Sequence, residues 1–184
     1  MPSVTIDACC LIDLLASGHA EAVLRSCGYA WHLPVAVQGE VQFVRQPDPT
    51  APSKFIAVPV DVTPLISAGV LTVCQPDDPL ELDLFTQYAT LFRSDGEAMC
   101  LAVAESRGWL IATDDKKAIR IGQQAGLTVL SSPQLMKTWA DNARPNQPTL
   151  VKALRDIEVL AQFRPNSTMP ECRWWLDQLP GSSS

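Results

Sequence analysis

Short apolar segments alternate with longer, helix-like segments along most of this chain. The apolar segments are too short and too continuous for a sheet with one face in water, and such segments are typical of parallel strands buried on both sides. The predicted fold class is therefore α/β, a three-layer α/β/α sandwich with a short central parallel sheet. The predicted strands are Val4–Ile6, Ala30–Leu33, Val70–Cys74, Trp109–Ala112 and Thr128–Leu130.

The helical segments between these strands have recognisable starts and stops. Asp7 is placed both to end the first strand and to cap the helix after it, while Gly28 and Gly108 each close a helix. Three prolines in residues 46–53 predict a loop, and Lys54–Val60 is an extended segment. The predicted helices are Ala8–Ala16, His19–Cys27, Val35–Val44, Leu80–Phe92, Gly96 to about Arg107, Lys116–Ala125 and Ser132 to about Asn142, with one turn at Thr63–Ala68.

The composition changes after residue 143. Residues 1–143 carry the alternation of strands and helices and are predicted to be one domain. In residues 144–184, prolines frame one helix, Leu150–Gln162, and a segment that contains Trp174 and Trp175. We expect this second part to be a helical extension packed on the domain, with its last residues disordered.

Composition limits the classes of protein to consider. Apolar residues make up 47% of the chain and charged residues 18%, as in compact globular proteins. No apolar run approaches the ~20 residues needed to span a bilayer. The amino-terminal segment lacks the basic residues of a secretory signal, so a cytoplasmic protein without membrane contact is expected. The six cysteines form no C-x-x-C pair, and the adjacent Cys9 and Cys10 suit neither a common disulfide nor a tetrahedral site, so we interpret them as small buried hydrophobes.

The net charge of −6 is unevenly distributed. Residues 1–112 carry 5 basic and 13 acidic side chains, whereas residues 113–184 carry 9 basic and 7 acidic ones. An acidic chain is not the usual partner of nucleic acid. However, carboxylates that bind divalent cations would lower the formal charge without repelling phosphate. The total charge therefore does not exclude a nucleic-acid substrate.

Acidic residues follow the predicted strands or begin the helices beside them. Asp7 follows the first strand, Asp114 and Asp115 follow Trp109–Ala112, and Glu97 lies in the first turn of the helix that precedes that strand. Glu40 lies further along the chain from the second strand. Because parallel strands end at one edge of a sheet, these carboxylates could converge there. Carboxylate oxygens suit one or two Mg²⁺ or Mn²⁺ ions, which activate water for phosphodiester hydrolysis.

Each acid also has a purely structural interpretation. Asp7, Asp95, Asp114 and Asp115 could cap helices, and Glu97 could complement a helix dipole. Glu40 could be a solvated position. The metal interpretation rests on all of these segments taken together and in this order.

Four segments carry a resemblance to a known family. They read VTIDACCLIDLL, PVAVQGEV, DGEAMCLAVAESRG and LIATDDKKA, and they extend over roughly residues 3–140. Their order and spacing resemble those of the PIN domain. The resemblance implies a metal-dependent endoribonuclease that uses Mg²⁺ or Mn²⁺, and such domains are often the VapC-type toxin of a toxin–antitoxin pair. The alternative is a PIN-like protein- or RNA-binding module that has lost catalysis.

The resemblance assigns roles to individual residues. Asp7 matches the first acid of the family, Glu40 the second and Glu97 the third, although most toxins of this type have aspartate at the third position. Asp115 and Asp114 compete for the fourth position, with the spacing from Thr113 favouring Asp115. Predicted catalytic residues are Asp7, Glu40, Glu97 and Asp115, predicted metal ligands are Asp7, Glu97, Asp114 and Asp115, and Thr113 and Asp95 are accessory candidates.

Basic and aromatic residues suggest partners. Arg93, Lys116, Lys117 and Arg120 lie near the predicted site and are candidates for contact with the RNA backbone, or they form a solvated helix face. Trp174 and Trp175 either pack against the domain or dock an antitoxin helix or the second subunit of a homodimer.

Overall fold

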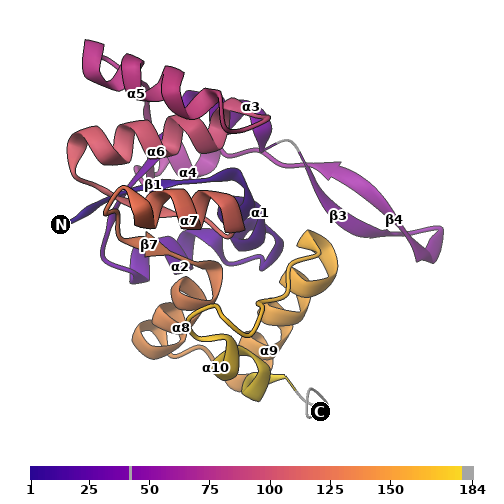
Figure 1. Cartoon of the computed structure of the whole chain (residues 1–184). Helices are drawn as coiled ribbons and strands as arrows, with labels where there is room; N and C mark the ends of the chain where they lie inside the picture. Colours follow the sequence, from indigo (N-terminus) through magenta and orange to yellow (C-terminus); the bar gives the residue numbers. More distant parts are fainter. Residues whose placement is uncertain (42, 180–184) are drawn as a thin grey trace.

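The computed structural model describes residues 1–41 and 43–179, with residues 52 and 53 described by their backbone alone (Figure 1). The strands are β1 (Ser3–Ile6), β2 (Ala30–Pro34), β3 (Phe43–Asp48), β4 (Ala51–Pro59), β5 (Leu71–Cys74), β6 (Leu110–Ala112) and β7 (Val129–Leu130). The helices are α1 (Ala8–Ala16), α2 (Ala20–Ser26), α3 (Val35–Glu40), α4 (Thr63–Ser67), α5 (Pro79–Ala89), α6 (Asp95–Arg107), α7 (Lys116–Gln124), α8 (Ser132–Ala143), α9 (Gln147–Asp156) and α10 (Cys172–Gln178), with a π-helical segment η1 (Ile157–Ala161) after α9. The expected disorder of the last residues concerns 180–184, which lie outside the described residues.

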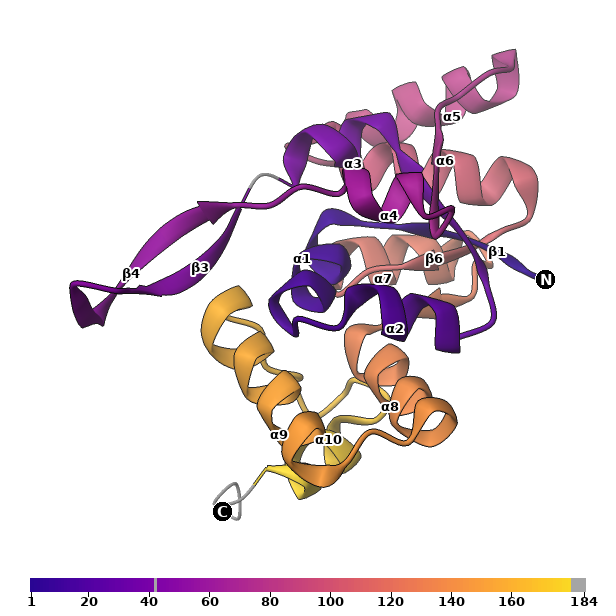
Figure 2. The same cartoon turned by 180° about the vertical axis from the view of Figure 1, so that it is seen from behind.

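Five parallel strands form the central sheet, in the order β5-β2-β1-β6-β7. On one face, α6 and α7 pack against the strands, with α3 and α5 against α6 (Figures 1 and 2). The helices α1, α2 and α8 lie on the other face. The predicted three-layer α/β/α sandwich is confirmed.

The middle strands β1 and β6 are largely buried on both faces, as their continuous apolar sequences predict, whereas the edge strand β5 exposes Thr72 and Val73. Thr5 in β1 faces α6, where its hydroxyl donates to the carbonyl of Cys100 at 3.2 Å. Successive side chains of a strand point to opposite faces, so the fully buried Val4 and Ile6 pack on the other side. Gly108, at φ +65°, ends α6 in the left-handed conformation that glycine adopts without a steric cost.

The predicted loop at residues 46–53 is wrong. This segment forms the turn and the adjoining strand ends of an antiparallel hairpin, β3–β4, which projects from the body of the molecule (Figure 1). The prolines are tolerated because the hairpin is a two-stranded sheet, in which both strands are edges and a missing N–H need not break a ladder. Pro47 pairs with Phe55 in this register, and Asp48 caps the turn by accepting from the N–H of Thr50 at 2.8 Å.

The predicted helix Val35–Val44 is too long. The helix α3 ends at Glu40, and Val41 has ψ 82°, outside the helical range. Val44 lies in β3 opposite Val58, so this valine supports a strand pair rather than a helical face.

The carboxy-terminal helices share the core of the sheet domain. Leu150, Leu154 and Ile157 belong to the same buried cluster as the strands and α1. Trp175 is fully buried, packs edge-on against Phe163, and donates its indole N–H to Glu158 at 3.2 Å. Of the two interpretations of Trp175, packing against the domain is confirmed, because the side chain is enclosed. Among the described residues, no helix is both long enough and apolar enough to cross a bilayer.

Candidate functional site

The order of the strands defines one crevice where ligands bind in folds of this class. From β1 the chain first builds β2 and β5 on one side and later places β6 and β7 on the other. In open α/β sheets, ligands bind beyond the carboxyl ends of the two strands at such a reversal, here β1 and β6. Asp7 directly follows β1 and Thr113 directly follows β6, and the N–H of Asp7 donates to the carbonyl of Ala112 at 2.9 Å. The predicted meeting of Asp7 with the segment after β6 is confirmed.

Asp7 is the most enclosed of the predicted acids, with 2% of its surface exposed. Its carboxylate accepts from the N–H of Ala8 at 2.6 Å, from the Cys9 thiol at 3.1 Å and from the Thr113 hydroxyl at 2.9 Å. Burial raises the pKa of Asp7 from 3.8 to about 6. The negative charge of Glu97 also raises this pKa, whereas the three hydrogen bonds lower it. Asp7 thus caps α1, as predicted, but it remains an electrostatically unfavourable anion.

Glu97 and Glu40 come to the site from helices on one side of the sheet. Glu97 lies in the first turn of α6, is half-buried, and accepts a hydrogen bond from the Ser94 hydroxyl. The carboxylate of Glu40, at the end of α3, accepts from the N–H of Gly96 at 2.8 Å. Glu40 is therefore not a solvated position. It holds the amino terminus of α6, and with it Glu97, in place.

An alanine at position 96 is expected to disturb this link between α3 and α6. A Cβ at Gly96 would lie 2.8 Å from the carboxyl carbon of Glu40, closer than real Cβ contacts. The flexible Glu40 side chain can move away from the new methyl group, so the main cost is its lost hydrogen bond to the N–H of Gly96, about 0.5–1.5 kcal/mol. Gly96→Ala should therefore lower the thermal unfolding midpoint in calorimetry. Gly39→Ala is the matched control, since no heavy atom lies within 4 Å of its new methyl group. Equal midpoints for Gly96→Ala and Gly39→Ala would contradict the contact.

Asp114 and Asp115 are adjacent in sequence but have different environments. Asp115 caps α7, with one carboxylate oxygen accepting from the N–H groups of Lys117 at 2.9 Å and Ala118 at 2.8 Å. Asp114 accepts from the Ser132 N–H at 3.0 Å and from the Ser132 hydroxyl at 2.5 Å. The Cys10 thiol also donates to Asp114, at 3.0 Å. Asp115 therefore caps a helix, which was its alternative, structural interpretation. Asp114 links the end of β6 to α1 and α8.

The accessory and basic candidates lie around this edge. Asp95 is an exposed first residue of α6, and its predicted role as N-cap is wrong because Ser94 occupies that position. The ammonium of Lys117 donates to the carbonyl of Leu91 and lies 5.2 Å from the centre of the Phe92 ring. The other three basic candidates, Arg93, Lys116 and Arg120, are exposed.

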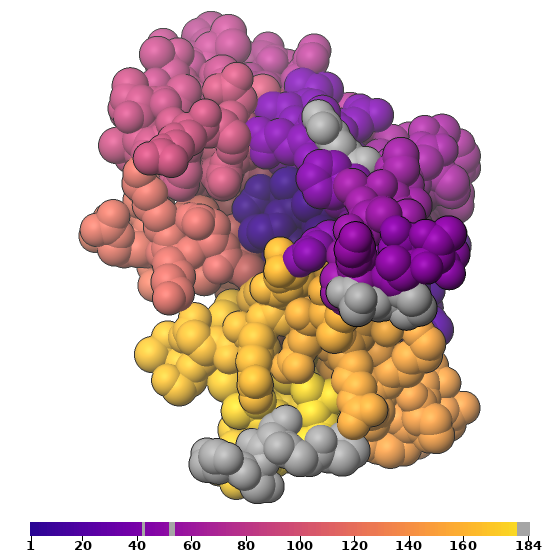
Figure 3. All heavy atoms as spheres, turned by 90° about the vertical axis from the view of Figure 1, so that its right-hand side faces the viewer, coloured from indigo at the N-terminus to yellow at the C-terminus, as the bar shows by residue number. Residues whose placement is uncertain are grey.

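Figure 3 shows the face onto which the carboxyl ends of the strands open. The indigo amino-terminal segment is recessed at its centre, between the pink and salmon residues of α6 and α7, the purple hairpin and the yellow-orange carboxy-terminal helices.

Ligand atoms gather at two places in the described part of the chain. The two groups of three acids or thiols whose ligand atoms lie within 4.8 Å of one another are Cys9, Cys10 and Asp114, and Asp77, Asp78 and Glu81. Glu81 in the second group is already neutralised by Arg107, whose Nε lies 2.5 Å from its carboxylate. Neither group contains Asp7, Glu40, Glu97 or Asp115, so the structure does not bring three of these four predicted acids into such a cluster.

Sequence reasoning missed the residues behind Asp114. Four residues were given no role at the site from the sequence: Cys9, Cys10 and Asp13 on α1, and Ser132 at the start of α8. The available signal was that Cys10 and Asp13 are three residues apart on a predicted helix and so share one face. An aspartate on the apolar face of that helix needs a polar partner in the core.

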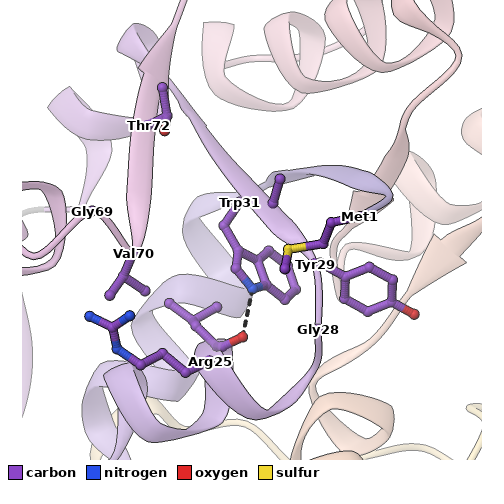
Figure 4. A pocket seen from close by; sticks show the side chains of 10 residues that line it. Met1, Arg25, Gly28, Tyr29, Trp31, Gly69, Val70 and Thr72 are labelled. Carbon is purple, nitrogen blue, oxygen red and sulfur yellow. Dashed lines mark hydrogen bonds between the residues drawn. The ribbon is translucent and has the colours of Figure 1, made fainter.

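A pocket of about 340 Å³ lies at the opposite edge of the sheet, before the starts of β1, β2 and β5 (Figure 4). Trp31 lines it and donates its indole N–H to the carbonyl of Leu24 at 2.9 Å. The one charged side chain in the lining, Arg25, is paired with Glu21 and with the carbonyl of Ala68. The other polar side chains in its lining are those of Tyr29 and Thr72.

Comparisons with protein-family models, with curated proteins and with solved structures give no match for this chain.

Proposed function

We propose that this protein is a metal-dependent endoribonuclease of the PIN type, with its active site at the carboxyl ends of β1 and β6. The observation that carries the proposal is the environment of Asp7, a buried carboxylate at the reversal of the strand order with a second carboxylate, Glu97, close enough to raise its pKa. Among the described residues, the hydrogen bonds to its side chain come from Ala8, Cys9 and Thr113, none of which is basic. A divalent cation would supply the missing positive charge.

The donor set suits Mg²⁺ or Mn²⁺. Such ions prefer oxygen ligands and keep several waters, so one or two carboxylates are a sufficient protein contribution. Asp7 and Glu97 would hold the ion, and the Thr113 hydroxyl keeps Asp7 oriented at 2.9 Å. When bound, the metal supplies an activated water and a Lewis acid for the phosphodiester.

Other side chains of the site have positioning roles in this proposal. Glu40 fixes the start of α6, and with it Glu97, through the N–H of Gly96. Asp115 has one oxygen committed to the cap of α7. The exposed Arg93, Lys116 and Arg120 offer positive charge to the phosphates of a polyanion beside the acids.

RNA as substrate, and a role as the toxin of a toxin–antitoxin pair, follow from the resemblance of the four sequence segments to PIN domains. A folded binding module without catalysis is the competing function. It is favoured by the hydrogen bonds that already engage Glu40 and Asp115, because such bonds give both acids a structural role.

Removal of the metal should distinguish these two functions. We expect the purified chain to cleave single-stranded RNA in the presence of Mg²⁺ or Mn²⁺, to lose this activity in EDTA, and to regain it when excess Mn²⁺ is added. DNA of the same sequence is the control for substrate class. Binding of RNA without any metal-dependent cleavage would support the binding module and overturn the proposal.

A further inference from the structure

Two thiols and two carboxylates meet beside the proposed active site, between α1, the end of β6 and the start of α8. We call this set, Cys9, Cys10, Asp13 and Asp114, the thiol–carboxylate cluster. Cys10 is fully buried and Asp13 is 3% exposed. The sulfur atoms of Cys9 and Cys10 and a carboxylate oxygen of Asp114 lie within 4.8 Å of one another, and Cys10 Sγ is 3.0 Å from Asp114.

The cluster is acidic and lacks a compensating cation. Among the described residues, the hydrogen bonds and ion pairs of these four side chains involve no lysine, arginine or histidine. Burial, followed by the charge of Asp114, holds the pKa of Asp13 well above its ordinary value. The Oδ2 atom of Asp13 is buried and has no hydrogen-bond partner in the part of the chain that the structure describes.

An unpartnered buried oxygen beside another carboxylate requires either a shared proton or a bound cation. The two sulfur atoms decide between ions. Mg²⁺ and Mn²⁺ favour oxygen ligands, whereas thiolates together with carboxylates suit Zn²⁺. We propose that the thiol–carboxylate cluster is a zinc site, with Cys9, Cys10 and Asp114 as ligands and the unpartnered carboxylate of Asp13 beside them. The fold thus adds a third ligand, Asp114, to the two adjacent cysteines, which the sequence alone did not indicate as a metal site.

The spacing is compatible with one ion. Zinc binds sulfur and oxygen at about 2.0–2.3 Å in a tetrahedral arrangement, so two ligand atoms of one ion lie roughly 3.3–3.8 Å apart. The ligand atoms of Cys9, Cys10 and Asp114 lie within 4.8 Å of one another, so side-chain shifts of about 1 Å or less would bring them to this spacing. Binding to the two thiols would release two protons, one from each cysteine, because the thiolate is the ligand form.

Hydrogen bonds around the cluster orient its members as zinc ligands are commonly oriented. Ser132 donates both its N–H and its hydroxyl to Asp114. The N–H of Asp114 donates to the sulfur of Cys9 at 3.2 Å. The ion would thus join three elements that meet at this point, and it would be distinct from the metal proposed between Asp7 and Glu97.

The full-length chain, purified without chelator, provides the test. We expect about one zinc per chain by elemental analysis, and a sulfur-to-metal charge-transfer band after replacement by Co²⁺. Cys10→Ser should weaken zinc binding at least about 10-fold, because even loss of a residue that only supports a metal ligand has an effect of that size. The same variant should abolish the rise in unfolding midpoint that zinc causes. Cys172→Ser is the matched control, since this cysteine is also buried but lies in α10. Asp13→Asn serves as a second, nearly isosteric variant if Cys10→Ser does not fold.

Two outcomes would overturn the zinc site. The first is a chain that retains no zinc and shows no charge-transfer band. The second is an Asp13→Asn variant that binds zinc as tightly as wild type and unfolds at a higher temperature, which would show a carboxyl pair sharing a proton. Glu97→Gln separates this proposal from the proposed function, because Glu97 is bonded to Ser94 and not to the cluster. This variant should remove Mn²⁺ binding and leave the zinc content unchanged.

Discussion

Asp7→Asn is expected to abolish metal-dependent RNA cleavage and, at the same time, to make the metal-free protein more stable. Asparagine keeps the size of the side chain and an oxygen that can accept from the N–H of Ala8, but it removes the negative charge. Loss of a metal-holding carboxylate should reduce activity to background in a gel assay with Mg²⁺. Calorimetric titration with Mn²⁺ should show no heat for this variant at the Asp7 site.

The stability gain follows from the pKa of Asp7, which the folded protein raises from 3.8 to about 6. Above pH 6 the folded protein holds an ionised carboxylate that the unfolded chain hydrates better, a penalty on the order of 1–3 kcal/mol. The penalty decreases as the pH falls from about 6 to 3.8, because Asp7 then takes up a proton in the folded state. Asp7→Asn should therefore unfold at a higher temperature than wild type at pH 8 in EDTA, and the difference should vanish near pH 4.

Asp83→Asn is the matched control for both measurements, because Asp83 is an exposed aspartate of α5. It should change neither cleavage nor stability. Full activity of Asp7→Asn under excess Mg²⁺ would remove Asp7 from the active site, whatever its effect on stability.

Trp175→Ala should destabilise the whole protein and not only its carboxy-terminal part. The side chain is fully buried, and its indole N–H is bonded to Glu158. Truncation of a buried tryptophan typically costs about 3–5 kcal/mol, which is a large part of the stability of a domain. Because Trp175 belongs to the same buried cluster as the central strands, we expect one unfolding transition at a lower denaturant concentration.

The neighbouring residue gives the control for this prediction. Trp174 is only half-buried, so Trp174→Ala should cost clearly less in the same urea titration. Two separate transitions in Trp175→Ala, followed by circular dichroism and by fluorescence, would show that the carboxy-terminal helices unfold independently of the sheet.

The position of Asp7 could be predicted because it depends on local information. A short apolar run followed by an aspartate and a helix places that aspartate at a strand end. The hairpin could not be predicted in the same way, because three prolines are usually a loop signal. The prolines are tolerated because β3 and β4 form a two-stranded sheet, in which both strands are edges.

The roles of Asp114 and Asp115 depend on contacts far along the chain. Asp114 is bonded to Ser132, which lies 18 residues later, and to Cys10, which lies 104 residues earlier. Nothing in the sequence next to Asp114 indicates either of these two contacts. The spacing from Thr113 therefore gave no indication that these adjacent carboxylates would enter different hydrogen-bond networks.

The buried carboxy-terminal helices also affect how this protein folds during synthesis. The last strand of the sheet ends at Leu130, but the apolar surfaces of α1 and α8 remain uncovered until η1 and Trp175 have been made. A nascent chain that already contains every strand would expose part of its core to solvent, and exposed apolar surface is where aggregation begins. The carboxy-terminal helices thus complete the buried core, and expression of residues 1–143 alone should give an insoluble product.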